Sequence, residues 1–221
     1  MNDFTYILVI IAITIIPQIL INVTYKKYAD VKVKSEQTGE DIVREMLLAN
    51  GVDNVTIGEI PGQLTDHYNS KTKRINLSSS NFKKPTVASI AVAAHETGHA
   101  LQDAKGYWFL KIRHKLGEPT VVAGNLCWVF VYLGFLFYYA PFVLLGVFLL
   151  GVVVLFDFVT LPVEINASNR AKRYLASTGR YTKEELEGVS KVLNAAAFTY
   201  VAATLAGVLQ FLRLIKKFER S

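Results

Sequence analysis

The 221-residue sequence has a single cysteine, Cys127, and few charged residues. One cysteine excludes an intramolecular disulfide framework and a cysteine-rich metal cluster. Charged residues make up 19% of the chain and hydrophobic residues 52%, whereas soluble domains are about 25% charged. This composition argues against a disordered chain and against an ordinary soluble enzyme.

The sequence also lacks a basic stretch interleaved with stacking aromatic residues, which is the usual mark of a nucleic-acid-binding surface. Its net charge of +6 comes from 24 Lys+Arg against 18 Asp+Glu. In a hydrophobic chain such an excess is typical of cations that flank transmembrane segments. We therefore expect the lipid bilayer as a partner and no nucleic acid.

Three long runs without charged residues indicate where the chain crosses the membrane. The first, residues 4–25, has 22 residues and is predicted as a retained transmembrane anchor, because it is too long for a signal-peptide core and no cleavage site follows. The second, residues 119–156, has 38 residues and would form a helix of about 57 Å. It is therefore predicted as two spans, 119–139 and 141–160. The third, residues 192–212, is an Ala-rich hydrophobic segment that is predicted as a fourth span.

Four spans place residues 26–118 and 161–191 on the same side of the membrane. That side carries 20 of the 24 Lys+Arg, and the other four follow the last span. Positively charged loops stay in the cytoplasm. The two segments are therefore expected on the cytoplasmic side. The basic C-terminal tail does not fit this rule, because four spans place it on the opposite side.

Residues 26–118 are predicted to form a small α+β unit. A helix should begin after Thr38 and end at Asn50-Gly51. Strands are expected at 55–57, 64–68 and 74–77, the last two joined as a hairpin, and a helix at about 85–103. The predicted fold is thus a single, mainly α, multi-pass membrane domain (1–221) with a small α+β extramembrane unit.

The helix expected at 85–103 carries the motif His95-Glu96-Thr97-Gly98-His99. Residues i and i+4 lie on the same face of a helix, so both imidazoles can bind one metal ion. Neutral imidazole suits Zn²⁺, which activates a water molecule. Glu96 follows the first ligand and can take a proton from that water.

A catalytic zinc site needs a third protein ligand and an open fourth position. The candidates are His67, His114, Asp157 and Glu164. Glu164 lies in the region 161–191, on a helix expected to begin near Pro162. Two membrane crossings return it to the side of the motif, so the topology permits it to meet the two histidines. Each of three candidates also has a non-functional interpretation. His114 and Asp157 would be residues at the membrane interface, and Glu164 would be an acidic residue at a helix N-terminus.

The segments 93–102 (AAHETGHALQ) and 161–171 (LPVEINASNRA), together with 64–69 (LTDHYN), resemble the YugP-type neutral zinc metallopeptidases of bacterial membranes. More distantly, the chain is similar to HtpX-like and prenyl-protein peptidases. The resemblance implies a gluzincin-like zinc site of His95, His99 and Glu164, with Glu96 as the general base. That wider group usually has an aspartate four residues after the glutamate, where this chain has Ser168.

Several further residues are candidates for supporting roles. Asn166, Ser168 or Asn169 could orient a metal ligand by neutral hydrogen bonds. His67 or Tyr68, just before the expected hairpin loop, could donate a hydrogen bond to an oxyanion or contact substrate. Alternatively, His67 and Tyr68 are strand residues that make only local polar contacts.

The residues alone predict a metal site that activates water, and the resemblance implies a zinc-dependent endopeptidase of the bacterial cytoplasmic membrane that acts on peptides or membrane proteins. Two alternatives stay open from the residues. One is a non-catalytic zinc-binding membrane scaffold or regulator. The other is a site-two-type intramembrane protease that uses Asp157 as a ligand. Only the enzymes would lose turnover on Glu96→Gln.

Overall fold

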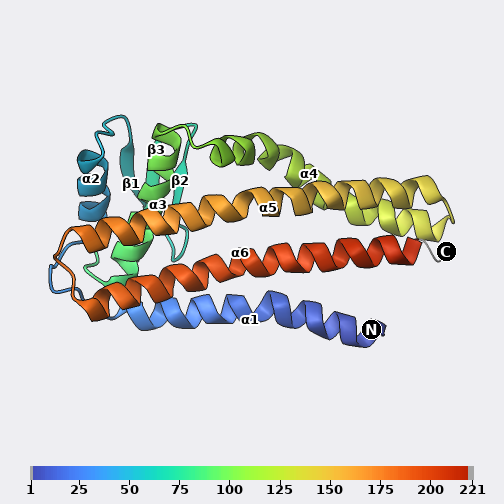
Figure 1. The fold of residues 1–221 in the computed structure, drawn as a ribbon, viewed down its shortest axis with the longest axis horizontal. Helices are drawn as coiled ribbons and strands as arrows, with labels where there is room; N and C mark the ends of the chain where they lie inside the picture. The colour runs from blue at the N-terminus through green and yellow to red at the C-terminus, as the bar shows by residue number, and fades with distance from the viewer. Residues whose placement is uncertain (1, 219–221) are drawn as a thin grey trace. The chain divides into compact units, whose positions relative to one another are not determined.

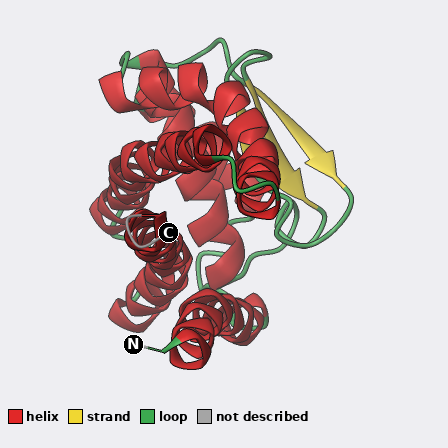
Figure 2. Cartoon of the chain, turned by 90° about the vertical axis from the view of Figure 1, so that its right-hand side faces the viewer, coloured by secondary structure: helices red, strands yellow, loops and turns green. Residues whose placement is uncertain are grey.

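A computed structural model describes residues 2–218, so Arg220 of the basic tail lies outside the described residues. The chain is mainly helical, and strands make up only a small part of it (Figure 2). The elements are α1 (Asp3–Ala29), α2 (Gly39–Ala49), β1 (Thr56–Ile60), β2 (His67–Asn69), β3 (Arg74–Ser78), α3 (Val87–Ala104), α4 (Trp108–Leu136), α5 (Ala140–Ser177) and α6 (Lys183–Phe218) (Figure 1). The predicted fold class is confirmed.

Within residues 2–218, four helices are long and apolar enough to cross a membrane: α1, α4, α5 and α6. Many of their large apolar side chains are exposed, such as Ile16 and Val121. Such exposure costs no hydrophobic free energy in lipid. The protein is therefore a multi-pass membrane protein.

The chain divides into two compact units. One contains the segment up to Ile16, Trp108–Pro162, and the chain from Thr199 onward. Its small apolar cluster includes Cys127, Val131, Leu150 and Leu214, so the single cysteine is a packing residue. The other unit contains Pro17–Tyr107 and Val163–Phe198, and it holds the predicted metal-binding residues.

Three prolines lie inside helices, and one of them corrects a helix start expected from the sequence. Pro17, Pro119 and Pro162 are interior to α1, α4 and α5. The helix that carries Glu164 therefore does not begin at Pro162 but runs unbroken from Ala140 to Ser177. Long apolar helices tolerate proline because neighbouring helices and local adjustments satisfy the freed carbonyl groups.

The second unit is built around a three-stranded sheet of order β1-β3-β2. β1 pairs with β3 in parallel, and β2 pairs with β3 in antiparallel register, with Tyr68 opposite Ile75. The hairpin predicted around residues 69–73 is confirmed. The strand expected at 64–68 is shorter than predicted, because Leu64 has a positive φ of 56° and lies in a loop.

The bounds of helices α2 and α3 in this unit are close to those predicted from the sequence. Thr38 and Asp41 form a capping box at the start of α2, as the predicted cap requires. The core contains fully buried side chains from α2, β3, α3 and α5, including Ile42, Ile75 and Leu175. Helix α3, which carries the His95–His99 motif, passes through this core, with 14 of its 18 residues buried.

Candidate metal centre

Helix α3 presents both histidines of the motif on one face. Thr86 caps its N-terminus by accepting a hydrogen bond from the Ser89 backbone N–H. The next turns are rich in alanine, and Ala91, Ala93 and Ala94 are fully buried, which fixes the helix in the core. The ring centroids of His95 and His99 are 4.7 Å apart, as the i, i+4 spacing predicts.

Gly98 allows α5 to approach this face closely. A Cβ atom at Gly98 would lie 2.7 Å from the carbonyl oxygen of Ala167 and 3.1 Å from its Cα. The backbones of the two helices are therefore in direct contact at this point. The contact brings Glu164, one turn before Ala167, beside the histidines.

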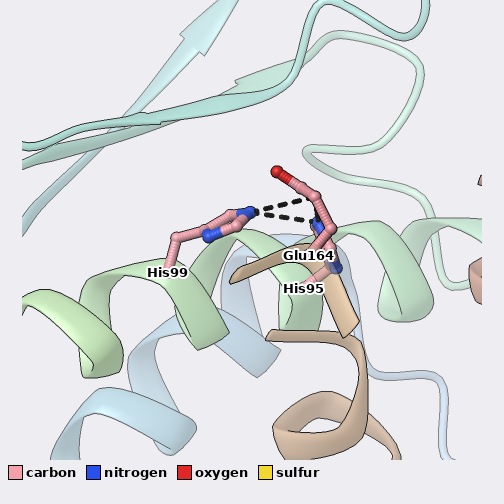
Figure 3. Close-up of side chains that lie close together, drawn as sticks. All are labelled: His95, His99 and Glu164. Carbon is pink, nitrogen blue, oxygen red and sulfur yellow. Dashed lines mark hydrogen bonds and ion pairs between the residues drawn. The ribbon is translucent and has the colours of Figure 1, made fainter. Parts of the chain in front are cut away.

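The three side chains converge on a common point (Figure 3). His95 Nε2 lies 3.1 Å from His99 Nε2 and 3.2 Å from Glu164 Oε2. His99 Nε2 lies 3.5 Å from the same carboxylate oxygen. Glu164 is 1% exposed, so a buried carboxylate faces two imidazole nitrogens.

This donor set fits zinc. Nitrogen and oxygen ligands of Zn²⁺ bind at about 2.0–2.1 Å, so neighbouring atoms of a tetrahedral site lie roughly 3.3–3.4 Å apart. The three observed separations, 3.1, 3.2 and 3.5 Å, bracket that value. Two histidines and one carboxylate also match the three-ligand set of catalytic zinc sites, which keep a fourth position for water.

Gln102 fixes which nitrogen of His99 is available. Its Nε2 donates to the Val163 carbonyl at 2.7 Å and to Asn166 Oδ1 at 3.1 Å. The amide oxygen must therefore face His99, and it accepts from Nδ1–H at 3.0 Å. The Nε2 lone pair of His99 is then free for a metal.

Ser168 holds the other imidazole. Its hydroxyl lies 3.1 Å from His95 Nδ1 and is buried. Ser168 thus gives His95 a neutral partner. Asn166 reaches the centre through Gln102, whereas Asn169 is exposed and its backbone carbonyl accepts from Arg173.

Glu96 is buried beside the three converging side chains. Burial raises the pKa of its carboxyl to about 7, against the opposing effect of His95. Its Oε2 accepts a hydrogen bond of 2.9 Å from the backbone N–H of Tyr68 in the edge strand β2. One carboxylate oxygen is thereby held by the sheet.

The side chain of Tyr68 also forms a hydrogen bond with α3. The hydroxyl donates to Asp103 Oδ2 at 2.7 Å, and Lys73 Nζ donates to the same oxygen at 2.6 Å. Burial and the Asp103 carboxylate raise the pKa of the Tyr68 hydroxyl. The hydroxyl proposed as an oxyanion donor is thus engaged by Asp103, two turns of α3 beyond Glu96.

The other sequence candidates lie elsewhere. His67 is exposed, and its ring contacts the Thr65 carbonyl and the Asn76 side chain. His114 is exposed on α4. Among the residues that the structure describes, the group able to hold a metal contains Glu164 and neither Asp157 nor His114.

Sequence reasoning gave no role to Gln102 or Asp103. Gln102 follows His99 by three residues and Asp103 follows Glu96 by seven. Both spacings place the pair on one helix face. The periodicity of α3 therefore indicates that Gln102 and Asp103 lie near the motif. Their partners in α5 and β2 could not be predicted from this helix alone.

Known proteins are similar to this chain along most of its length. Residues 4–219 match the family described as "Putative neutral zinc metallopeptidase". A relative from Bacillus subtilis (strain 168), named "Putative membrane protease YugP", is 37% identical over 201 residues, which cover 91% of this chain and 89% of the relative. No solved structure matches the chain.

Proposed function

Since this chain belongs to the zinc metallopeptidase family that its sequence matches, we propose that it is a membrane-embedded endopeptidase with Zn²⁺ held by His95, His99 and Glu164. Family membership makes the protein a hydrolase with zinc as its cofactor. The observation that carries the proposal is the convergence of two imidazole nitrogens and one buried carboxylate oxygen, beside a second buried carboxylate.

Glu96 is the proposed general base. Bound zinc would polarise a scissile carbonyl and increase the acidity of water. The carboxylate of Glu96 takes the proton of the attacking water and passes it to the leaving amine. Because Tyr68 N–H occupies Oε2, Oε1 is the oxygen that handles the proton.

The surrounding hydrogen bonds support this assignment. Gln102 and Ser168 bond the Nδ1 atoms of His99 and His95, which leaves both Nε2 atoms directed at Glu164. The amide oxygen of Gln102 fixes the tautomer of His99, and the Ser168 hydroxyl fixes the ring orientation of His95. A scaffold that only stored zinc would have no use for a buried carboxylate beside it, which favours the enzyme over the scaffold.

The substrate class and orientation form part of the same proposal. Peptides or membrane proteins are the proposed substrates, cleaved at the cytoplasmic face of the bacterial membrane. The side follows from the 20 Lys+Arg in residues 26–118 and 161–191. We propose the same segments within the single domain as the sequence predicts. They are an anchor at 4–25, the α+β unit at 26–118, a transmembrane hairpin at 119–139 and 141–160, the Glu164 region at 161–191 and a last span at 192–212.

The test is cleavage of casein by the purified chain in detergent. Cleavage should stop on addition of a chelator and return on addition of zinc, since deprotonated ligands bind the metal reversibly. Cleavage that survives complete zinc removal would contradict the proposal.

A further inference from the structure

The second unit contains a groove between the C-terminal end of α1 and the N-terminal end of α6. Its volume is about 600 Å³, and its lining includes Leu20, Val23 and Phe198 together with Lys27, Lys191 and Asn194. These parts of the two helices lie side by side with opposite chain directions (Figure 1). A Cβ atom at Gly188 of α6 would lie 2.7 Å from the Tyr28 ring, so the helices are in close contact there.

Apolar and cationic side chains separate along this groove. Leu20 and Val23 belong to the charge-free run of α1, and Lys27 lies beyond its end. On α6, Lys191 precedes the charge-free run that contains Phe198. Because the helices are antiparallel, both lysines lie at one end of the groove and the apolar side chains follow from it. This is the polarity of a membrane–water boundary.

Positive charge predominates at the cationic end of the groove. Among the described residues that line the groove, two are lysines and none is acidic. Lys172 of α5 adds a third ammonium group, since its Nζ donates to Asn194 Oδ1 at 2.6 Å. Lys27 and Lys191 are both exposed. The acidic Glu187 lies in the neighbouring hollow, one turn before Lys191.

We propose that this groove binds one anionic phospholipid, with its phosphate between Lys27 and Lys191 and an acyl chain along Leu20, Val23 and Phe198. Basic pockets between membrane helices bind anionic headgroups, and each Lys or Arg near such a lipid adds to the affinity. The apolar wall is accessible to an acyl chain, with Val23 60% and Phe198 43% exposed. The charge selects the headgroup, and the apolar wall selects a lipid over free phosphate.

The experiment uses the full chain in uncharged detergent and native mass spectrometry with equal amounts of phosphatidylglycerol and phosphatidylcholine. Phosphatidylglycerol adducts should predominate on the wild type. Lys27→Gln together with Lys191→Gln should weaken phosphatidylglycerol binding by roughly 10- to 30-fold, because each lysine near an anionic lipid contributes about a factor of five.

The matched control removes the same charge elsewhere. Lys111→Gln together with Lys115→Gln changes two exposed lysines of α4 and should leave binding within about twofold of the wild type. A circular-dichroism melt verifies that both double variants fold. Val23→Trp fills the apolar part of the groove at unchanged charge and should also reduce lipid binding.

Three results would overturn the proposal. One is equal binding of the two lipids by the wild type. A second is equal loss of binding in the α4 control, which would show a general charge effect. The third is retention of phosphatidylglycerol by the folded Lys27/Lys191 variant. This result contradicts the proposal even if free inorganic phosphate or a second copy of the chain binds in the groove.

Discussion

Two neutral side chains, Gln102 and Ser168, orient the imidazoles of the metal centre. Gln102 donates two hydrogen bonds to α5, so its carbonyl oxygen has to face His99 Nδ1. Ser168 bonds His95 Nδ1 at 3.1 Å. Neutral partners leave Glu164 as the anionic member of the converging trio, with its charge directed at both Nε2 atoms.

The choice of acidic ligand gives a prediction at the same scale. Glu164→Ala should leave the purified protein with substoichiometric zinc, because two histidines alone hold zinc poorly. Asp157→Asn should retain most of the zinc, since the converging group does not contain that residue. Metal analysis by mass spectrometry of both variants decides the point. Zinc loss in Asp157→Asn with full occupancy in Glu164→Ala would favour the intramembrane alternative.

At the scale of elements, the centre depends on the crossing of α3 and α5 at Gly98. The motif and its helix were predictable because the i, i+4 spacing, the Thr86 cap and the alanine-rich face are all local features. The start of the Glu164 helix was not, because Pro162 is also a common first residue of a helix. Only the packing of α5 shows that it lies in the interior of a 38-residue helix.

Gly98→Val tests this crossing. The new side chain would meet Ala167 backbone atoms that are 2.7 and 3.1 Å from its Cβ, and overpacking of this kind costs about 1–3 kcal/mol. We expect a lower midpoint of thermal unfolding and at least tenfold weaker zinc binding, measured by competition with a chelator.

Gly117→Val is the matched control for the crossing. Gly117 also lies in a helix, and apart from its chain neighbours and the nearby backbone of its own helix no atom lies within 4 Å of its Cβ position. Zinc binding by this control should equal that of the wild type. If Gly98→Val also bound zinc normally, the close approach of α3 and α5 would not be what assembles the centre.

At the scale of the whole molecule, charge-free runs indicated four membrane-spanning helices, and the structure has four candidates within residues 2–218. The helices extend well beyond the apolar runs, as in α6, which has 36 residues around a run of 21. Composition shows where lipid can lie, whereas a helix continues wherever protein packing supports it. The sheet register and the hydrogen bonds of Tyr68 to α3 join distant segments, so a single sequence could not give them.

The orientation of the molecule is open to a labelling experiment. Single cysteines at the exposed positions Ser79 and Ser177, in a Cys127→Ala background, should resist membrane-impermeant thiol reagents in intact cells and react after lysis. The reason is the concentration of Lys+Arg in residues 26–118 and 161–191. Reaction of both cysteines in intact cells would place the centre outside the cytoplasm.

The most direct measurement is the rate of peptide cleavage by Glu96→Gln at full zinc occupancy. Glutamine keeps the size of the side chain and can still accept from Tyr68 N–H, but it cannot take a proton from water. With zinc bound as in the wild type, hydrolysis should fall by roughly 10²–10⁴-fold, the usual contribution of a positioned general base. Equal cleavage by the wild type and by zinc-loaded Glu96→Gln would contradict the proposed mechanism.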